Sequence, residues 1–578
     1  MGLPVLTPTG YLQKSVFAII LSAVLMTIGT AMPQASAASV NVDFNGDGYA
    51  DLAVGVPKEG VNGRAEAGLV NVIYGSASGL SATATPDQRF FQDYAAPSGS
   101  FPNIRDTSEA GDHFAAAIAA GDFNKDGYSD LAIGVRGEDL GSIADAGAVN
   151  VIYGSASGLS PDSPVVNQFW TQDSPSVEDS AEVGDRFGSA LATGDFNKDG
   201  YADLAIGVHG EGINGHPGAG SVNILYGSAA GLSATSTPDQ RFFQDSAGVA
   251  DFSEDNDHYG ASLAVGDLNK DGYGDLMIGA PGEDIGSVAD AGAISVIYGS
   301  AAGLSPSGPV PDQLWTGSSP GISDDLPAAC PTPISGIGNP GALASGDFNG
   351  DGYSDMAFGA ATHFAGEGTM LVCGHSFYGS DGIAIVVYGS ASGLAITSTR
   401  DDQVGREDSI ADYARTISAG DFNKDGYSDL VASFAVYGIV APGDLSGGGI
   451  GSVQVYHGSA SGLPEDSDGL LQVSQRWSQD SPNVEDNGES QDNFGATVAT
   501  GDFNNDGYLD MAVGVPREEA GMSDLGSIDN DNTGAVNVIY GSAGGLSATT
   551  IADQFWTQDS PNVEDAAEIG DMFGMALA

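Results

Sequence analysis

One nine-residue motif recurs seven times along this chain. It has the form D-x-N-x-D-G-x-x-D without exception, and successive copies begin 72 to 81 residues apart. The copies begin at Asp43, Asp122, Asp195, Asp267, Asp347, Asp421 and Asp502. A repeat at such a regular spacing indicates one structural unit used many times, not several unrelated domains. It therefore limits the fold of the 578-residue chain more than any other feature does.

Each repeated unit is predicted to contain four short β-strands. A Phe-Gly segment precedes the motif, as in residues 185–194, and a short apolar segment follows it, as in 203–208. A third apolar segment, such as 146–155, leads to a fourth aromatic segment, such as 167–173. Short β-rich segments bounded by Gly, Asp, Asn and Ser are typical of strands and tight turns, and no long 3.6-residue apolar period predicts a helix. We therefore expect an all-β fold, a seven-bladed β-propeller of four-stranded blades, with a linear β-solenoid as the alternative.

The two ends of the repeat array predict how the ring closes. The first unit starts directly before its motif and lacks a Phe-Gly segment, whereas the chain ends in DMFGMALA at 571–578. A C-terminal strand that completes the first blade would remove an exposed sheet edge. The alternative is an eighth unit that is cut short.

The repeated motif carries the ligands that calcium prefers. Ca²⁺ takes six to eight oxygen ligands from carboxylates, amides and backbone carbonyls. Side chains at positions 1, 3 and 5 can face one centre, Tyr at position 7 would contribute its carbonyl, and Asp at position 9 would close the cage. Three aspartates in one loop repel one another without a cation, and the lack of His and Cys disfavours zinc and copper. Asx-turns without an ion are the alternative.

We therefore expect about seven structural Ca²⁺ ions, bound with dissociation constants of roughly 10⁻⁴ to 10⁻³ M. The predicted ligands are Asp43, Asn45, Asp47, Tyr49, Asp51, Asp122, Asn124, Asp126, Tyr128, Asp130, Asp195, Asn197, Asp199, Tyr201, Asp203, Asp267, Asn269, Asp271, Tyr273, Asp275, Asp347, Asn349, Asp351, Tyr353, Asp355, Asp421, Asn423, Asp425, Tyr427, Asp429, Asp502, Asn504, Asp506, Tyr508 and Asp510.

The charge of the chain excludes two classes of partner. Lys and Arg number 17 against 77 Asp and Glu, so the formal net charge is −60. Nucleic acids and anionic lipids both bind mainly through basic side chains. Hydrophobic residues make up 41% of the chain, which is enough for a folded core.

The N-terminal residues predict export. Lys14 precedes an apolar run at 16–28, and a small-residue cleavage site follows at 35–37. We expect residues 1–37 to be a signal peptide and 38–578 to be a secreted, monomeric propeller with no membrane span, an uncleaved anchor being the alternative. Export makes a disulfide between Cys330 and Cys373 permissible, but two free thiols are equally compatible with the sequence.

No residue is predicted to be catalytic. Short turns such as GSASG at 75–79 recur in the units and fit a turn between the third and fourth strands. The seven histidines do not recur at one blade position, and the QDSP segments that begin at Gln172, Gln479 and Gln558 fit connections between blades. The recurrent tryptophans fit core packing better than ligand stacking; they are Trp170, Trp315, Trp477 and Trp556.

The combined pattern of residues 185–207, DRFGSALATGDFNKDGYADLAIG, resembles the FG-GAP repeat of the integrin α-subunit propeller and its secreted bacterial relatives. The resemblance covers nearly all of 38–578. It implies Ca²⁺ in the loop between the first two strands of each blade and a protein ligand on the opposite face. The unit around Asp347 departs from the pattern before the motif and holds both cysteines, and the unit around Asp421 departs on both sides of the motif. These departures fit either specialised loops or neutral drift.

These features favour an extracellular binding or adhesion module for a protein or a glycan. An extracellular hydrolase or lyase built on a propeller is one alternative. A passive envelope or matrix protein is the other.

Overall fold

The structure is a computed structural model, and its described residues all belong to the unit 33–578. They are 41–94, 104–162, 165–320, 322, 334–335, 337–338, 342–362, 370–372, 375–377, 381–396, 403–406, 411–436, 451–465, 471–489, 491–519 and 532–578. The predicted signal peptide, Cys330 and Cys373 lie outside them. Within the described residues, no helix has the length and hydropathy needed to cross a membrane.

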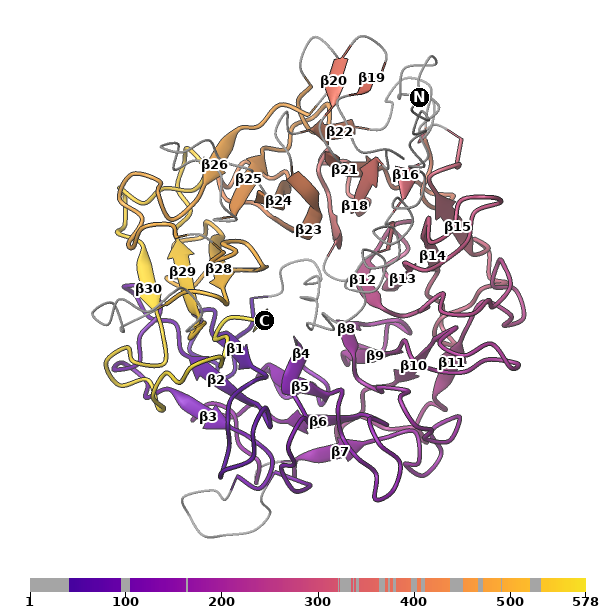
Figure 1. Ribbon diagram of the computed structural model, residues 1–578, viewed down its shortest axis with the longest axis horizontal. Helices are drawn as coiled ribbons and strands as arrows, with labels where there is room; N and C mark the ends of the chain where they lie inside the picture. The colour runs from indigo at the N-terminus through magenta and orange to yellow at the C-terminus, as the bar shows by residue number, and fades with distance from the viewer. Residues whose placement is uncertain are drawn as a thin grey trace, which may run out of the picture. The chain divides into compact units, whose positions relative to one another are not determined.

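The described strands form seven blades arranged as a β-propeller, which confirms the predicted fold (Figure 1). Blade one contains β31 (Ala576–Leu577), β1 (Leu52–Val56), β2 (Leu69–Ile73) and β3 (Gln88–Phe90). Blade two contains β4 (Phe114–Gly121), β5 (Asp130–Val135), β6 (Ala148–Ile152) and β7 (Gln168–Trp170). Blade three contains β8 (Ala190–Gly194), β9 (Asp203–Val208), β10 (Ser221–Leu225) and β11 (Gln240–Phe242). Blade four contains β12 (Ser262–Gly266), β13 (Asp275–Ala280), β14 (Ala293–Ile297) and β15 (Gln313–Thr316).

The remaining blades follow the same order with one elaboration. Blade five contains β17 (Leu343–Gly346), β18 (Asp355–Thr362), β21 (Asp381–Val387) and β22 (Gln403–Arg406). It also has an extra strand, β16 (Ile334–Ser335), and β19 (Met370–Val372) pairs with β20 (His375–Phe377) in a separate hairpin. Blade six contains β23 (Ala411–Gly420), β24 (Asp429–Val436), β25 (Ser452–Tyr456) and β26 (Gln475–Trp477). Blade seven contains β27 (Thr497–Gly501), β28 (Asp510–Val515), β29 (Ala535–Ile539) and β30 (Gln554–Trp556).

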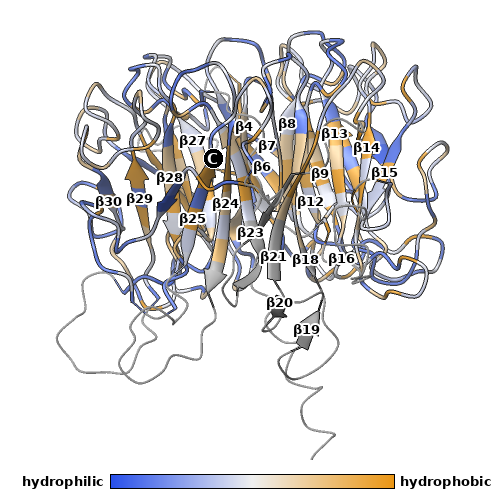
Figure 2. Ribbon diagram, turned by 90° about the horizontal axis from the view of Figure 1, so that it is seen from above, coloured by the Kyte–Doolittle hydropathy of each residue, from blue (hydrophilic) through white to orange (hydrophobic). Residues whose placement is uncertain are grey.

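The core is divided into seven clusters, each built from the apolar side chains of two neighbouring blades. The hydrophobic residues are concentrated on the strands, as Figure 2 shows. Phe187 illustrates the pattern, because it precedes β8 and is fully buried in the cluster that contains Val149 and Val151 of β6. The Phe-Gly segment therefore connects its own blade to the preceding one.

The C-terminal strand closes the ring, as the sequence predicted. In β31, Leu577 pairs with Val54 and Ala576 pairs with Gly55, both of β1. Phe573 is fully buried and packs with Val54 of blade one and Val536 of blade seven. The last residues therefore complete the first blade.

The antiparallel order of the strands separates two faces of the propeller. The nine-residue motifs, called here the acidic loops, connect the first and second strands, and the GSASG-type turns connect the third and fourth. Both connections lie at the same end of a blade, which we call the acidic-loop face. Connections between the second and third strands, and those between blades, lie at the opposite face.

Candidate functional site

Each acidic loop is folded around its own side chains. In the loop of blade three, the Asp195 carboxylate accepts hydrogen bonds from the backbone N–H groups of Asp199 (3.1 Å) and Gly200 (2.8 Å). Asn197 Oδ1 accepts a bond from the same Asp199 N–H (2.9 Å), and Asp199 Oδ1 accepts one from Tyr201 N–H (3.0 Å). Gly200 has φ +84°, a conformation that favours glycine.

These four bonds recur in all seven acidic loops, from blade one to blade seven. The structure thus brings the side chains of positions 1, 3 and 5 together in every copy. Their oxygens are hard ligands of the kind that Ca²⁺ takes, and carboxylates at positions 1 and 5 carry the matching charge. The donor set fits calcium.

Position 9 has a role that the sequence pattern does not reveal. Asp203 is fully buried, and its two oxygens accept bonds from Phe196 N–H (2.9 Å) in its own loop and Gly227 N–H (2.9 Å) in the turn after β10. Burial raises the pKa of the Asp203 carboxyl to about 8, although both hydrogen bonds act in the other direction. Position 9 therefore joins the acidic loop to the adjacent turn, and a role as a calcium ligand stays a prediction.

Lysines at position 4 connect successive acidic loops. Lys198 Nζ donates to the backbone carbonyl of Asp271 in the next loop (2.7 Å) and lies 5.3 Å from the ring centroid of Tyr273. The same arrangement holds for Lys125, Lys270 and Lys424. These ammonium groups therefore connect the acidic loops of blades two to five and those of blades six and seven.

The GSASG-type turns are also bound by the preceding blade. Leu232 N–H donates to the hydroxyl of Tyr153 (3.1 Å), and Gln168 Nε2 donates to the Leu232 carbonyl (3.0 Å). The junction of blade seven with blade one, called here the seam, has the same arrangement. Leu80 N–H donates to Tyr540 Oη (3.3 Å), and Gln554 Nε2 donates to the Leu80 carbonyl (3.0 Å). The sequence predicted a turn between the third and fourth strands at these residues, which the structure confirms, and the contacts with the preceding blade are an addition from the structure.

Blade six differs at this position. His457 occupies the place that Tyr74 or Tyr153 has in other units, and its Nδ1 lies 3.1 Å from Asp429 Oδ2. The hydrogen bond to Asp429 raises the pKa of His457. The sequence places this histidine where other units have tyrosine, since HGSASG at 457–462 aligns with YGSASG at 74–79. Its contact with Asp429 is known only from the structure.

A second set of carboxylates lies buried between blades on the opposite face. Gln172 Nε2 donates to Glu211 Oε2 (2.7 Å), Gln558 Nε2 donates to Glu59 Oε2 (2.7 Å), and three further Gln–Glu pairs repeat the contact. This confirms that the QDSP segments connect blades. Burial raises the pKa of Glu211 to about 8 and that of Glu59 to about 8. No sequence motif pointed to a site at these residues.

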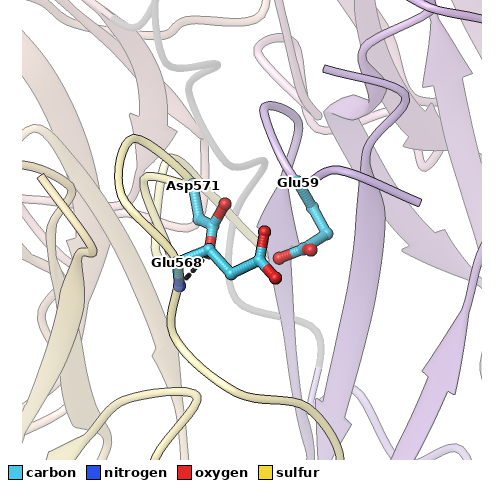
Figure 3. Close-up of side chains that lie close together, drawn as sticks. All are labelled: Glu59, Glu568 and Asp571. Carbon is cyan, nitrogen blue, oxygen red and sulfur yellow. Dashed lines mark hydrogen bonds between the residues drawn. The ribbon is translucent and has the colours of Figure 1, made fainter. Parts of the chain in front are cut away.

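Close groups of three carboxylates occur at three of these junctions. In each group, one oxygen per residue lies within 4.8 Å of the others. The groups are Glu59, Glu568 and Asp571 (Figure 3); Glu182, Asp185 and Glu211; and Asp486, Glu489 and Glu518. The carboxylates of the acidic loops are not among them in the part of the chain that is described. The acidic loops form no such group of three carboxylates because the carboxylate at position 9 faces backbone N–H groups instead of the carboxylates at positions 1 and 5.

An open surface pocket lies at the outer edge of blade two. Its volume is about 630 Å³, and its lining includes Arg105, Phe169 and Trp170.

The FG-GAP repeat family matches six segments of the chain. They are residues 36–73, 114–152, 187–225, 259–297, 339–369 and 494–537. The unit of Asp421, which departs from the pattern, lies outside these segments.

Curated relatives include the phosphatidylinositol-glycan-specific phospholipase D of Rattus norvegicus, which is 32% identical over 171 residues, or 30% of this chain and 18% of that protein. Integrin alpha-PS5 of Drosophila melanogaster is 30% identical over 178 residues (30% and 16%), and integrin alpha-V of Gallus gallus is 29% identical over 249 residues (42% and 19%). The chain thus matches less than a fifth of the length of each of these relatives. A crystal structure of rhamnogalacturonan lyase YesW aligns with a TM-score of 0.32 and 10% identity over 76% of this chain and 70% of that one, a likeness too weak to carry an argument.

Proposed function

Because this chain is an FG-GAP repeat protein whose described residues form a seven-bladed β-propeller, we propose that it is a secreted, calcium-stabilised binding module. It binds about seven structural Ca²⁺ ions in its acidic loops. It acts outside the cell as a monomer that contacts a protein or a glycan, and it has no nucleic acid partner. The observation that carries the proposal is the hydrogen-bond arrangement that all seven acidic loops share.

The calcium part of the proposal is supported by the electrostatics of the loops. The carboxylate at position 5 is exposed in every loop, and the one at position 1 is half-buried in six loops and buried in the seventh. Both, and the amide oxygen at position 3, are held in place by backbone N–H groups, so little ordering is needed when a cation binds. Where position 4 is lysine, its one positive charge lies at the next loop, as for Lys198 at Asp271, and a single charge does not offset the two carboxylates at positions 1 and 5. A hard divalent cation supplies the missing positive charge.

Calcium binding is tested by counting ions on the full-length chain. Native mass spectrometry should detect about seven Ca²⁺ from the acidic loops, and a chelator should lower the melting temperature. Asp195→Asn should lose one ion, whereas Asp290→Asn, an exposed turn residue with the same change of charge, should lose none. A melting temperature that the chelator leaves unchanged would contradict the proposal.

The opposite face is the better candidate for the partner. Its connections between second and third strands are 12 residues long in blades one to four but 18, 15 and 19 residues long in blades five, six and seven. Regular short connections are enough to build a blade, so the longer ones are available for recognition. The family resemblance also implies a ligand on this face.

Binding is tested with a glycan array and a panel of purified matrix and envelope proteins, with and without Ca²⁺. Deleting residues 521–530 from the blade-seven connection should weaken the binding that the full chain shows, whereas Lys125→Ala on the acidic-loop face should not. Glycan binding that is lost only in Trp170→Ala would place the site in the blade-two pocket instead.

The catalytic alternative is tested by a hydrolase and lyase screen in the same buffers. The turn serines give it no support, because Ser76 Oγ donates to the Gly79 carbonyl of its own turn (2.7 Å). If no activity and no ligand are found, the passive matrix role becomes the better account.

A further inference from the structure

Basic side chains of blades two to four gather on the opposite face, near the centre of the ring. Some of them precede the first strand of a blade and the others follow the second strand. First strands of neighbouring blades contact one another, so they are the innermost strands, and Figure 1 shows β4, β8 and β12 around the middle of the ring. We call these side chains the basic row; they are His113, Arg136, Arg186, His209 and His258.

Within a blade, two members of the basic row are opposite each other on adjacent strands. In blade three, Gly210 N–H donates to the Asp185 carbonyl (3.1 Å). The residues beside these two, His209 and Arg186, are therefore opposite each other. Blade two has the equivalent backbone bond, between residues 137 and 112 (3.0 Å), which places Arg136 opposite the histidine of its own blade.

The basic row continues from one blade to the next. His258 Nδ1 lies 3.0 Å from the His209 carbonyl oxygen, and the two imidazole centroids are 5.6 Å apart. Burial and the nearby guanidinium of Arg186 lower the pKa of Arg136 to about 10. The pKa of His209 falls to about 3, mainly through burial and also through its neighbours in the row. At neutral pH the two arginines therefore stay charged, whereas His209 is neutral.

The fold does not require basic residues at these positions. The residue that precedes the buried aromatic side chain has a positive φ of 55° to 61° in five units, but it is Asn493 in blade seven and Met572 in blade one. At the positions of Arg136 and His209, other units have proline; the prolines are Pro57, Pro281 and Pro516. The same backbone is therefore built with neutral residues elsewhere in the ring.

The two guanidinium groups of the basic row are unpaired. Arg136 is half-buried and Arg186 is exposed, and neither side chain forms a hydrogen bond or an ion pair with the part of the chain that is described. Glu66 and Asp145 attract Arg136 but are exposed and form no ion pair with it, and Glu66 lies instead 3.6 Å from His113. In a chain with 17 Lys and Arg against 77 Asp and Glu, two adjacent arginines repel each other while acidic partners are abundant. They are available to an anion from outside the chain.

The chemistry of the surface favours a carboxylate on a protein. A guanidinium presents its N–H groups in a fork that matches a carboxylate. The net charge of −60 repels a polyanion, so a ligand with few and local negative charges fits better. Val183 and Phe252 are 72% and 73% exposed, and they lie on the inter-blade segments that lead to Arg186 and His258. Exposed apolar side chains beside a charged group are typical of protein–protein contacts.

We propose that the basic row binds an acidic side chain of a partner protein, with Arg136 and Arg186 as the residues that contact its carboxylate. Apolar residues beside that acidic side chain contact Val183 and Phe252. This inference rests on the proposed function, because it names the chemistry by which the opposite face recognises a protein. It places the contact on blades two to four, away from the long connections of blades five to seven.

The test measures binding of full-length proteins to three immobilised probes by surface plasmon resonance, at neutral pH and constant Ca²⁺. The probes are a peptide in which Glu alternates with Leu, the same peptide with Gln in place of Glu, and an oligogalacturonate. Arg186→Asn is the main variant, because Asn493 has the equivalent position and φ in blade seven, and Arg136→Gln is the second. Arg517→Gln is the control, since it removes the same charge after the second strand of blade seven, outside the basic row.

Wild type and Arg517→Gln should bind the Glu peptide equally, and Arg186→Asn and Arg136→Gln should bind it at least about tenfold more weakly. The melting temperature of Arg186→Asn should not fall, because the variant loses a repulsive charge. Equal affinity in all four proteins, or equal binding of the Gln peptide, would overturn the inference. Tighter binding of the oligogalacturonate than of the Glu peptide would assign the basic row to an acidic glycan and contradict the protein partner.

The inference and the proposed function fail separately. If a matrix or envelope protein binds wild type and Arg186→Asn equally but not the chain that lacks residues 521–530, the proposed function stands and the basic row is not its site. If the Glu peptide binds as expected while no protein or glycan of the panel does, the basic row stands and the wider proposal is contradicted.

Discussion

At the scale of single residues, the last glycine of the repeated turns is explained by a contact with the preceding blade. Gly231 ends the GSAAG turn of blade three with φ +91°, and a Cβ there would overlap the hydroxyl of Tyr153 from blade two. Tyr153 is fully buried and bonded to Leu232 N–H, so it cannot move aside easily. The positive φ of the turn already favours glycine at position 231. The contact with Tyr153 is a second reason, because it leaves no room for a side chain.

The first prediction separates these two requirements. Gly215 has φ +94°, and a Cβ added there would meet no atom within 4 Å, so Gly215→Ala reports backbone strain alone. It should lower the free energy of unfolding by about 1–2 kcal/mol, and Gly231→Ala should cost about 1–3 kcal/mol more because of overpacking. Denaturant unfolding checks both values. Adding Tyr153→Phe to Gly231→Ala should recover part of the loss, and equal losses in the two single variants would contradict the steric account.

At the scale of elements, neighbouring blades are joined by buried carboxyl groups as well as by apolar side chains. Glu138 follows β5, is 1% exposed and accepts a hydrogen bond from Gln92, which follows β3 of blade one. Burial is the main cause that raises the pKa of Glu138 to about 9 and that of Asp112 to about 7. Such groups orient one blade on the next at a cost that depends on pH.

The second prediction uses the sign of this shift. The folded protein keeps the Glu138 proton at pH values where the unfolded chain, with a pKa near 4.5, has released it. The resulting loss of stability is absent below pH 4.5 and grows as pH rises toward about 9. Glu138→Gln lacks the ionisable group, so its advantage over wild type should increase by about 1–3 kcal/mol between pH 5 and pH 8.

Urea unfolding at several pH values and constant Ca²⁺ measures this difference. Glu485→Gln, at an exposed position of another inter-blade segment, should show no such trend. An advantage of Glu138→Gln that stays constant or shrinks as pH rises would be inconsistent with a buried, protonated Glu138.

At the scale of the whole molecule, closure of the ring depends on the last residues of the chain. The cluster between blades seven and one includes Phe573 and Leu577 from this segment, together with residues of β1, β2, β28 and β29. Without them, blade one would have an unpaired edge at β1, and the apolar cluster at the seam would be opened to water.

The third prediction tests closure without deleting the segment. Phe573→Ala removes a fully buried side chain and should cost about 3–5 kcal/mol of unfolding free energy, seen as a drop of several degrees in melting temperature. Ile569 lies in the same segment but is 64% exposed, so Ile569→Ala should change stability by about 0.5 kcal/mol or less. Scanning calorimetry compares them, and similar shifts for both would mean that the segment does not hold the ring.

The repeat by itself determined the number of blades, the strands of blades one to four and the position of each acidic loop. These features depend on short-range chemistry, since the side chains of Asp195 and Asn197 accept hydrogen bonds from backbone N–H groups at most five residues away. Blade five was predicted less well, because β16 and the β19–β20 hairpin lie in a unit that has lost the Phe-Gly pattern.

Contacts between blades were decided only by the tertiary structure. Gln558 and Glu59 are 499 residues apart, and nothing in the local sequence of either indicates that they meet. The same holds for Gly231 of blade three, which lies against Tyr153 of blade two. A sequence motif reports interactions within one short segment. Contacts between blades depend instead on how neighbouring blades are placed when the ring closes, and no local motif encodes that placement.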